Sequence, residues 1–122
     1  MGTKCECGES PKLVFACSGA ADVGAVADLA ARKTTKDGAG KMFCMAGIGG
    51  RVPGIIETTK AASKILAIDG CPLDCVKLSL ENAGFTDFDH LRVTDLGMVK
   101  GETDISDGNV AETAAKAAEL LR

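Results

Sequence analysis

Three cysteines stand at equal intervals along the chain, and their spacing is the feature that most limits how it can fold. Cys17, Cys44 and Cys71 are 27 positions apart, and each comes at the end of a short apolar run. This interval is about the length of one strand and one helix in a parallel α/β domain. If each run is a strand, the three thiols lie at the carboxyl edge of one sheet, where open α/β folds place their sites.

The rest of the pattern completes four strand–helix units after an irregular arm at residues 1–11. Strands are expected at 12–17, 41–46, 64–69 and 90–96. Helices are expected at about 20–33, 53–63, from Pro72 to Gly84, and in a closing segment capped by Asp107 or Asn109. Alternation of strands and helices implies parallel pairing. We therefore predict that residues 12–122 form a single three-layer α/β domain with a four-stranded, mainly parallel sheet in the order 2-1-3-4 and flanking helices, flavodoxin- or Rossmann-like.

Composition is typical of a globular protein. The chain has 122 residues, which is enough to bury a core without disulfide bonds, and 46% of them are apolar and 25% charged. A net charge of −3 gives no electrostatic reason to bind nucleic acid or an anionic membrane. With no secretory signal or apolar span in the sequence, we expect a cytoplasmic protein.

Six cysteines in a reducing compartment are better explained as metal ligands or reactive thiols than as disulfides. Cys71 and Cys75 are four positions apart, so a helix starting here presents both sulfurs on one face near its positive end. With the two earlier strand-end cysteines they make a candidate four-thiolate zinc site. Any one of these cysteines taken alone could instead be a small buried apolar side chain. Cys5 and Cys7 could add ligands, form a resolving thiol pair or have no role.

Other polar residues near the predicted site are given simpler roles. Ser18 and Gly19 follow the first strand and are candidate cofactor-binding residues, because a partial dinucleotide-binding pattern starts at Gly19. Its middle glycine is missing, which weakens this signal. Asp69 and Asp74 are expected to act as turn residues or helix caps. His90, the one histidine, is expected at the edge opposite the cysteines and so to be neither base nor ligand.

The stretch from Asp69 to Cys75, Asp-Gly-Cys-Pro-Leu-Asp-Cys, resembles the signature of the DGC-domain family, which is named for its first three residues. The resemblance begins at Cys17-Ser-Gly, continues through Cys44-Met-Ala-Gly and covers nearly the whole chain. Members are described as zinc-binding proteins on the basis of their cysteines. The resemblance implies that Cys17, Cys44, Cys71 and Cys75 are chelating residues, and it implies no particular biochemical activity.

Three functions are compatible with these observations. The leading hypothesis is a small zinc-binding protein in which the four cysteines hold one ion, for zinc sensing, zinc delivery or binding of a small anionic or thiol ligand. The second is a thiol-dependent redox or sulfur-transfer enzyme, with Cys71 as nucleophile and Cys75 or Cys17 as its resolving partner. The third is an iron–sulfur protein that recruits Cys5 and Cys7.

Overall fold

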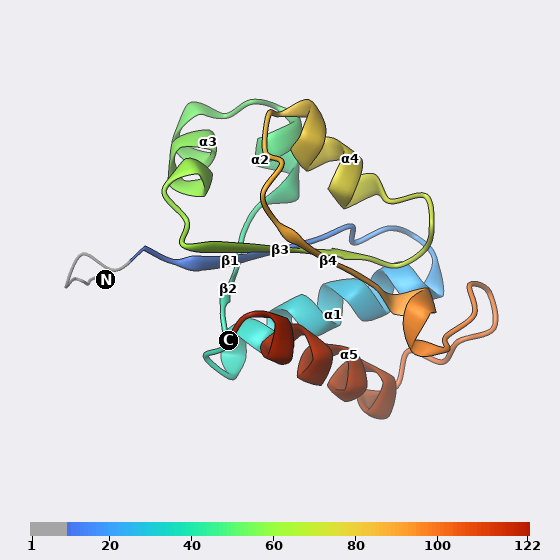
Figure 1. Ribbon diagram of the computed structural model, residues 1–122. Coiled ribbons are helices and arrows are strands. Elements are labelled where there is room, and N and C mark those ends of the chain that lie inside the picture. Colours follow the sequence, from blue (N-terminus) through green and yellow to red (C-terminus); the bar gives the residue numbers. More distant parts are fainter. Residues whose placement is uncertain (1–9) are drawn as a thin grey trace.

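The computed structural model describes residues 10–122 and consists of a parallel sheet between two layers of helices (Figure 1). The strands are β1 (Lys12–Ala16), β2 (Lys41–Met42), β3 (Lys64–Asp69) and β4 (Asp89–Arg92). Their order across the sheet is β2-β1-β3-β4, and each neighbouring pair is parallel. The predicted fold class and strand order are confirmed. The predicted arm lies almost wholly outside the described residues, as do Cys5 and Cys7.

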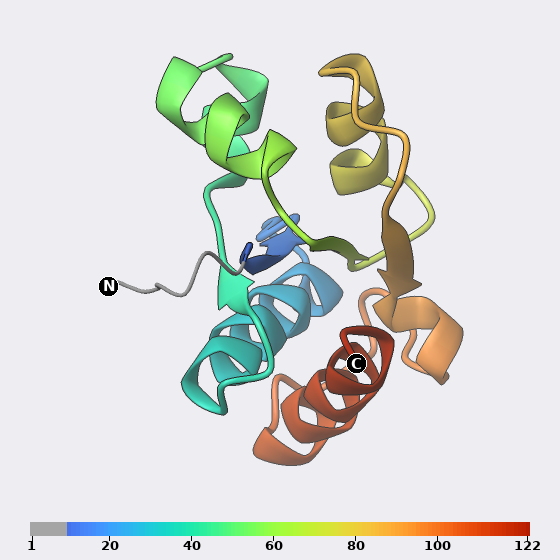
Figure 2. The same cartoon turned by 60° about the vertical axis from the view of Figure 1, so that its left-hand side comes forward.

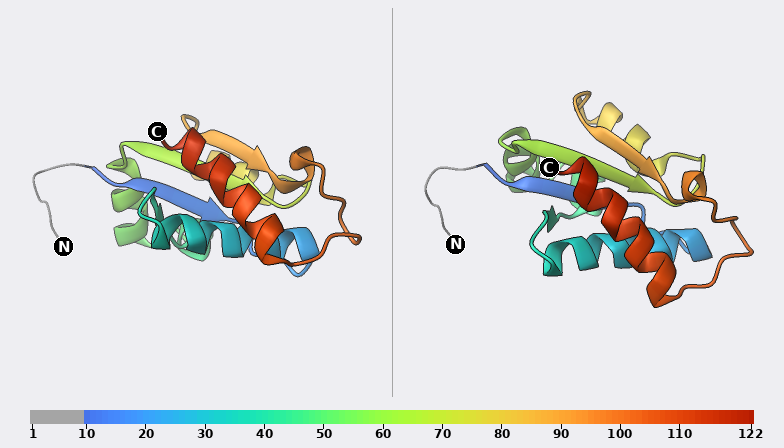
Figure 3. Two further views of the ribbon diagram at one scale, coloured as in Figure 1. Left: turned by 90° about the horizontal axis from the view of Figure 1, so that it is seen from below. Right: turned by 60° about the horizontal axis from the view of Figure 1, so that its bottom comes forward.

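Helices cover both faces of the sheet. One face carries α1 (Asp22–Lys36) and α5 (Asp107–Leu120), and the other carries α2 (Met45–Gly49), α3 (Pro53–Lys60) and α4 (Cys75–Asn82) (Figures 1 and 2). A short 3-10 helix, η1 (Val93–Leu96), follows β4. Seen from below, α1 and α5 run side by side in front of the strands (Figure 3). No helix within residues 10–122 has the length and apolar character needed to cross a membrane.

The central strands β1 and β3 are apolar because helices cover them on both sides. Successive side chains of a strand point to opposite faces, so each strand feeds two cores. The core under α1 and α5 contains Val14, Ala16, Leu66 and Ile68, and the core under α2 and α4 contains Leu13, Phe15, Ile65 and Ala67. These two strands hold the carboxyl edge of the sheet in place.

The edge strands are shorter than predicted. β2 has two residues, and Cys44 is the N-cap of α2, so this cysteine does not end a strand. The fourth apolar run divides into β4 and η1. An edge strand pairs on one side only, so turning its apolar run into a helix sacrifices fewer ladder hydrogen bonds than it would in the middle of the sheet.

Two predicted helix starts are wrong. The helix expected from Pro72 begins at Cys75, because residues 71–74 form a turn closed by a hydrogen bond from the Asp74 amide to the Cys71 carbonyl. The closing helix is capped by Ser106, whose side chain accepts a hydrogen bond from the amide of Asn109. Serine is among the preferred N-cap residues because its hydroxyl satisfies an unpaired amide of the first turn.

Glycines let three segments meet at the carboxyl edge. A Cβ atom on Gly70, just after β3, would lie 2.8 Å from the backbone nitrogen of Gly24 and from the carbonyl carbon of Val23 in α1. A Cβ atom on Gly24 would lie 2.7 Å from the carbonyl oxygen of Gly19. Real Cβ atoms do not approach backbone so closely. The glycine in the Asp-Gly-Cys triplet therefore allows β3 to end directly against α1.

We predict that Gly70→Ala lowers the free energy of unfolding by roughly 2 kcal/mol, because the new methyl group overlaps backbone that cannot move aside. Urea denaturation followed by circular dichroism measures the change. Gly49→Ala in α2 is the control, since its Cβ would meet nothing within 4 Å. This helical substitution should raise stability by about 0.5–1 kcal/mol. Equal stabilities of the Gly70→Ala and wild-type proteins would contradict the close packing.

A candidate metal and thiol site at the carboxyl edge of the sheet

A cavity of about 430 Å³ opens where the chain leaves β1 and β3, at the edge predicted from the cysteine spacing. Cys17 follows β1, Cys71 lies in the turn after β3, and Cys75 begins α4; all three line the cavity. Cys17 and Cys71 are half-buried, and Cys75 is exposed. Cys44 is also exposed but does not line this cavity. The structure thus brings together three of the four predicted ligands.

Thiols are suitable ligands for zinc, but the sulfurs of these cysteines do not lie close enough together in this structure to share one ion. Within residues 10–122, no three cysteine sulfurs lie within 4.8 Å of one another. Zinc–sulfur bonds of about 2.3 Å place sulfurs about 3.8 Å apart in a tetrahedral site. Rotation of a cysteine between staggered positions moves its sulfur by about 3 Å, so thiols of one cavity can draw together. Metal binding by these cysteines stays a prediction.

Lys100 brings a positive charge to the thiols. It is the one basic residue among the described residues that line the cavity. Its ammonium nitrogen donates a hydrogen bond to the Cys71 sulfur at 3.5 Å. A nearby cation favours the thiolate, which is the form that binds metal or attacks an electrophile. Because Lys100 is 29 positions from Cys71, no local pattern in the sequence points to this contact.

Asp22 holds the loop that carries Lys100 against α1. Its carboxylate accepts hydrogen bonds from the amide of Gly101 at 2.9 and 3.0 Å and from the amide of Thr103 at 2.9 Å. The hydrogen bonds from Gly101 and Thr103 hold the pKa of Asp22 below its ordinary value, because they stabilise the ionised form. The loop at residues 97–106 is therefore fixed beside the cavity.

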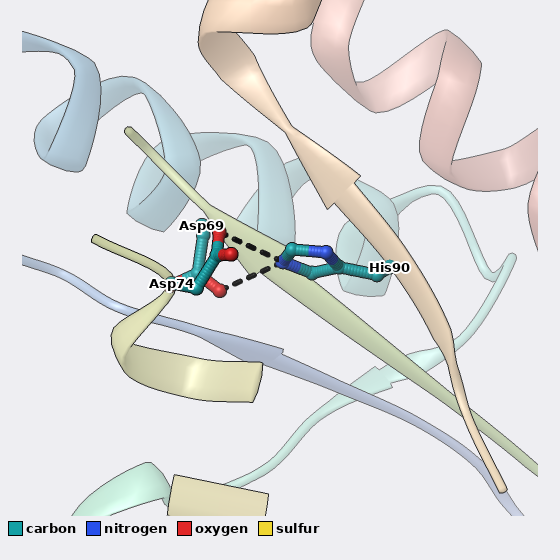
Figure 4. A group of neighbouring side chains, drawn as sticks. All are labelled: Asp69, Asp74 and His90. Carbon is teal, nitrogen blue, oxygen red and sulfur yellow. Dashed lines mark hydrogen bonds and ion pairs between the residues drawn. The ribbon is translucent and has the colours of Figure 1, made fainter. Parts of the chain in front are cut away.

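Asp69 connects the end of β3 to the start of α4. Its side chain is 1% exposed, and its carboxylate accepts hydrogen bonds from the amides of Val76 at 2.8 Å and Lys77 at 3.2 Å. The same carboxylate lies 2.9 Å from Nε2 of His90 (Figure 4). Asp69 thus satisfies first-turn amides of α4, as a helix cap does, from the neighbouring strand. Asp74, the N-cap by position, makes no side-chain capping bond.

Asp74 fixes the turn at residues 71–74 to the edge strand. Its backbone adopts the left-handed conformation, with φ 56° and ψ 42°. Its carboxylate forms a two-bond ion pair with Arg92, at 2.7 Å to Nε and 2.6 Å to Nη2. The hydrogen bonds from Arg92 lower the pKa of Asp74, and Asp74 in turn raises the pKa of Arg92. The strained residue thus has strong partners that hold it in place.

The prediction that His90 lies away from the site is wrong. His90 pairs with Ala67 in β3, only two positions before Asp69. Its Nε2 lies 2.9 Å from the Asp69 carboxylate and 3.7 Å from that of Asp74. Because β4 has only four residues, its beginning and its end are both within side-chain reach of the carboxyl edge. We name Asp69, Asp74, His90 and Arg92 the Asp–His–Arg cluster.

The Asp–His–Arg cluster contains the one set of three side chains within residues 10–122 whose ligand atoms are close enough to hold a metal: Asp69, Asp74 and His90. Their oxygens already accept hydrogen bonds from two backbone amides and from Arg92. A metal ion there would compete with the guanidinium for the same carboxylate. The contacts favour a structural role, in which the cluster positions the turn that carries Cys71 and the helix start at Cys75.

Of the two candidate cofactor-binding residues, Gly19 lines the cavity and Ser18 does not. Ser18 has a positive φ of 51°, and its hydroxyl donates to the Asp28 carboxylate at 2.7 Å. Gly19 lines the cavity and packs against Gly24. The partial dinucleotide pattern is thus explained by close packing between loop and helix. A cofactor role for either residue stays a prediction.

We predict that Asp69→Asn lowers the free energy of unfolding by roughly 2 kcal/mol, because an amide cannot replace a buried carboxylate that accepts several hydrogen bonds. Asp95→Asn is the matched control, since Asp95 is 64% exposed and reaches Arg92 only at 3.8 Å. Its effect should stay within about 0.5 kcal/mol. Urea denaturation measures both, and equal effects would show that Asp69 does not hold the helix start.

The sequence of this domain is shared with known proteins. Residues 13–117 match the family model described as DGC domain. Over 88 residues the chain is 38% identical to the anaerobic and virulence modulator AnvM of Pseudomonas aeruginosa, an alignment that covers 72% of this chain and 67% of that protein. No solved structure matches the chain. The family match spans β1 to α5, so the chain belongs to the DGC-domain family.

Proposed function

We propose that this domain binds a metal ion, zinc in the first place, through thiolates at the carboxyl edge of its sheet. The observation that carries the proposal is the convergence of Cys17, Cys71 and Cys75 on one cavity. Cys17 follows β1, whereas Cys71 and Cys75 lie four positions apart after β3, so the thiols come from two segments that are far apart in the sequence. Packing alone gives no reason for thiols from two such segments to face the same space.

The surroundings of the thiols suit negatively charged ligands. Cys75 is the first residue of α4, where the helix dipole favours negative charge. Lys100 places a full positive charge beside Cys71. Soft thiolate ligands favour zinc over hard cations such as magnesium. Zinc bound here would act as a Lewis acid or a structural link.

The role we favour for this site is sensing, because the acidic residues among the described part of the cavity lining already have structural partners. The carboxylates that line it, Asp69 and Asp74, are both engaged in the Asp–His–Arg cluster. The similar protein AnvM is named a modulator. We extend a modulating role to this chain as part of the proposal.

Zinc content of the purified protein tests the proposal. Protein prepared without added metal or chelator should carry about one zinc per chain, and Cys71→Ser and Cys75→Ser should each lower this at least tenfold, because a neutral hydroxyl is a poor zinc ligand. Ala20→Ser is the control, since Ala20 lines the same cavity without offering a thiol. Zinc-free protein that takes up no zinc on titration, with every thiol reacting freely, would contradict the proposal.

A second function is favoured by the contact between Lys100 and Cys71. An ammonium at 3.5 Å suits a thiolate nucleophile, as a thiol-dependent redox or sulfur-transfer enzyme requires. In metal-free protein, iodoacetamide should then alkylate Cys71 first, as thiolate displaces iodide. Lys100→Met should slow this reaction several-fold, while Lys116→Met, which removes an exposed lysine bound to Glu119, should not.

Mass spectrometry of the labelled peptides measures these rates. Added zinc separates the two functions, because a thiolate bound to metal is a weaker nucleophile. Protection of Cys71 by one equivalent of zinc supports metal binding as the main function. Fast alkylation that zinc does not change supports the enzyme, and equal slow labelling of all cysteines contradicts it.

A further inference from the structure

We propose that, among the residues that the structure describes, Cys17, Cys71 and Cys75 are the ligands of the metal, and that its fourth position binds a small thiol that carries a carboxylate. The thiolate of this ligand would bind the metal, and its carboxylate would bind Lys100. The inference rests on the proposed function and goes beyond it by naming a ligand class. It assigns Cys44, which the sequence pattern groups with the other three cysteines, no part in the site.

Cys44 lies outside the cavity lining, at the start of α2. β2 pairs with β1 only at Leu13 and Val14, two residues before β1 ends. The chain then turns directly into α2, which is held by the fully buried Ile48. Gly47 packs so closely on Ile55 that a side chain there would overlap it. Because these contacts fix α2, Cys44 at its N-cap is held outside the cavity lining.

The cavity has room for more than a metal ion. A cavity of about 430 Å³ falls in the size range of small-molecule sites, which is about 300–1,000 Å³, and is far larger than one metal ion needs. Gly19, Ala20 and Ala21 form part of its wall, and these small side chains leave the interior open. Leu73 adds an apolar surface at the rim and is itself 65% exposed. A short aliphatic ligand fits such walls.

Lys100 can balance the charge of an anionic ligand at the metal. Zinc with three thiolates carries one net negative charge, so a further anion needs a positive partner nearby. Lys100 is that partner, and within residues 10–122 no carboxylate pairs with its ammonium. The carboxylates on the same wall already have partners: Asp69 has His90, and Asp74 has Arg92. The ammonium is therefore available to an incoming carboxylate.

Hydrogen bonds on both sides of Lys100 fix the backbone that carries it. Three hydrogen bonds to Asp22 fix the backbone on the far side of Lys100, at Gly101 and Thr103. The side chain of Thr103 also binds the amide and carbonyl of Val99, on the near side. A lysine whose backbone is fixed beside the cavity selects a ligand by charge, since the loop that carries it need not be ordered when the ligand binds. Thiols without a charged group would bind the metal but gain nothing from Lys100.

The test uses protein loaded with Co²⁺ in place of zinc, whose visible absorption reports the ligands of the metal. Mercaptoacetate is the charged probe, and 2-mercaptoethanol is the matched thiol without a carboxylate. We expect both to change the cobalt spectrum, with mercaptoacetate binding more tightly. Lys100→Met should raise the Kd for mercaptoacetate about tenfold and that for 2-mercaptoethanol less than twofold. Cys44→Ser should keep the metal, its spectrum and both responses.

Each failure has its own meaning. If wild-type protein binds no cobalt or zinc, the proposed function itself fails. If metal binds but Cys44→Ser loses it, or if neither thiol changes the spectrum, four protein ligands close the site and this inference is overturned. If Lys100→Met weakens both thiols equally, or neither, the assigned ligand class is wrong. Circular dichroism of each variant separates these outcomes from loss of fold.

Discussion

One buried carboxylate holds the thiol site together. Asp69 ends the central strand β3, is 1% exposed, and accepts hydrogen bonds from the first turn of α4. Without this link, the start of α4 would be tied to the sheet mainly through the ion pair between Asp74 and Arg92. Because the carboxylate is inaccessible to water, its loss would leave amides unpaired at the helix start. The positions of Cys71 and Cys75 therefore depend on a residue that reaches neither sulfur.

The Asp–His–Arg cluster extends this link to the edge of the sheet. His90 and Arg92 lie on β4, and they reach Asp69 and Asp74 on the other side of the turn. A turn that contains a left-handed, non-glycine residue needs such partners to stay in one conformation. The Asp-Gly-Cys triplet then has a physical account: the carboxylate anchors α4, the glycine permits contact with α1, and the thiol faces the cavity.

The sequence alone was sufficient for the architecture and for the edge that carries the site. The apolar runs of β1 and β3 identify buried parallel strands, and the interval between Cys17 and Cys71 places both thiols at one sheet edge. The short β2 and β4 were not predictable, because the length of an edge strand depends on how the following helix packs. Equal spacing groups Cys44 with the other cysteines, but spacing does not determine where a strand ends. β2 ends at Met42, two residues before Cys44.

Long-range polar contacts were also missed. The predicted fourth strand has seven residues, which would put His90 far from the carboxyl edge. The observed β4 has four residues, so His90 lies close enough to this edge to contact Asp69. Lys100 lies in a segment with no motif, and the partial pattern around Asp22 does not indicate its partners; their contacts join residues 29 and 79 positions apart. Periodicity and spacing describe neighbours along one element, while such contacts depend on how loops from different elements meet.

The central claim is that sulfurs from Cys17, Cys71 and Cys75 bind a metal in the cavity beyond the carboxyl ends of β1 and β3. Crystals of the protein as purified, measured on both sides of the zinc absorption edge, test it most directly. We predict one anomalous peak within about 2.3 Å of those three sulfurs. A peak among Asp69, Asp74 and His90, or zinc-loaded crystals with no peak at the cysteines, would contradict the account.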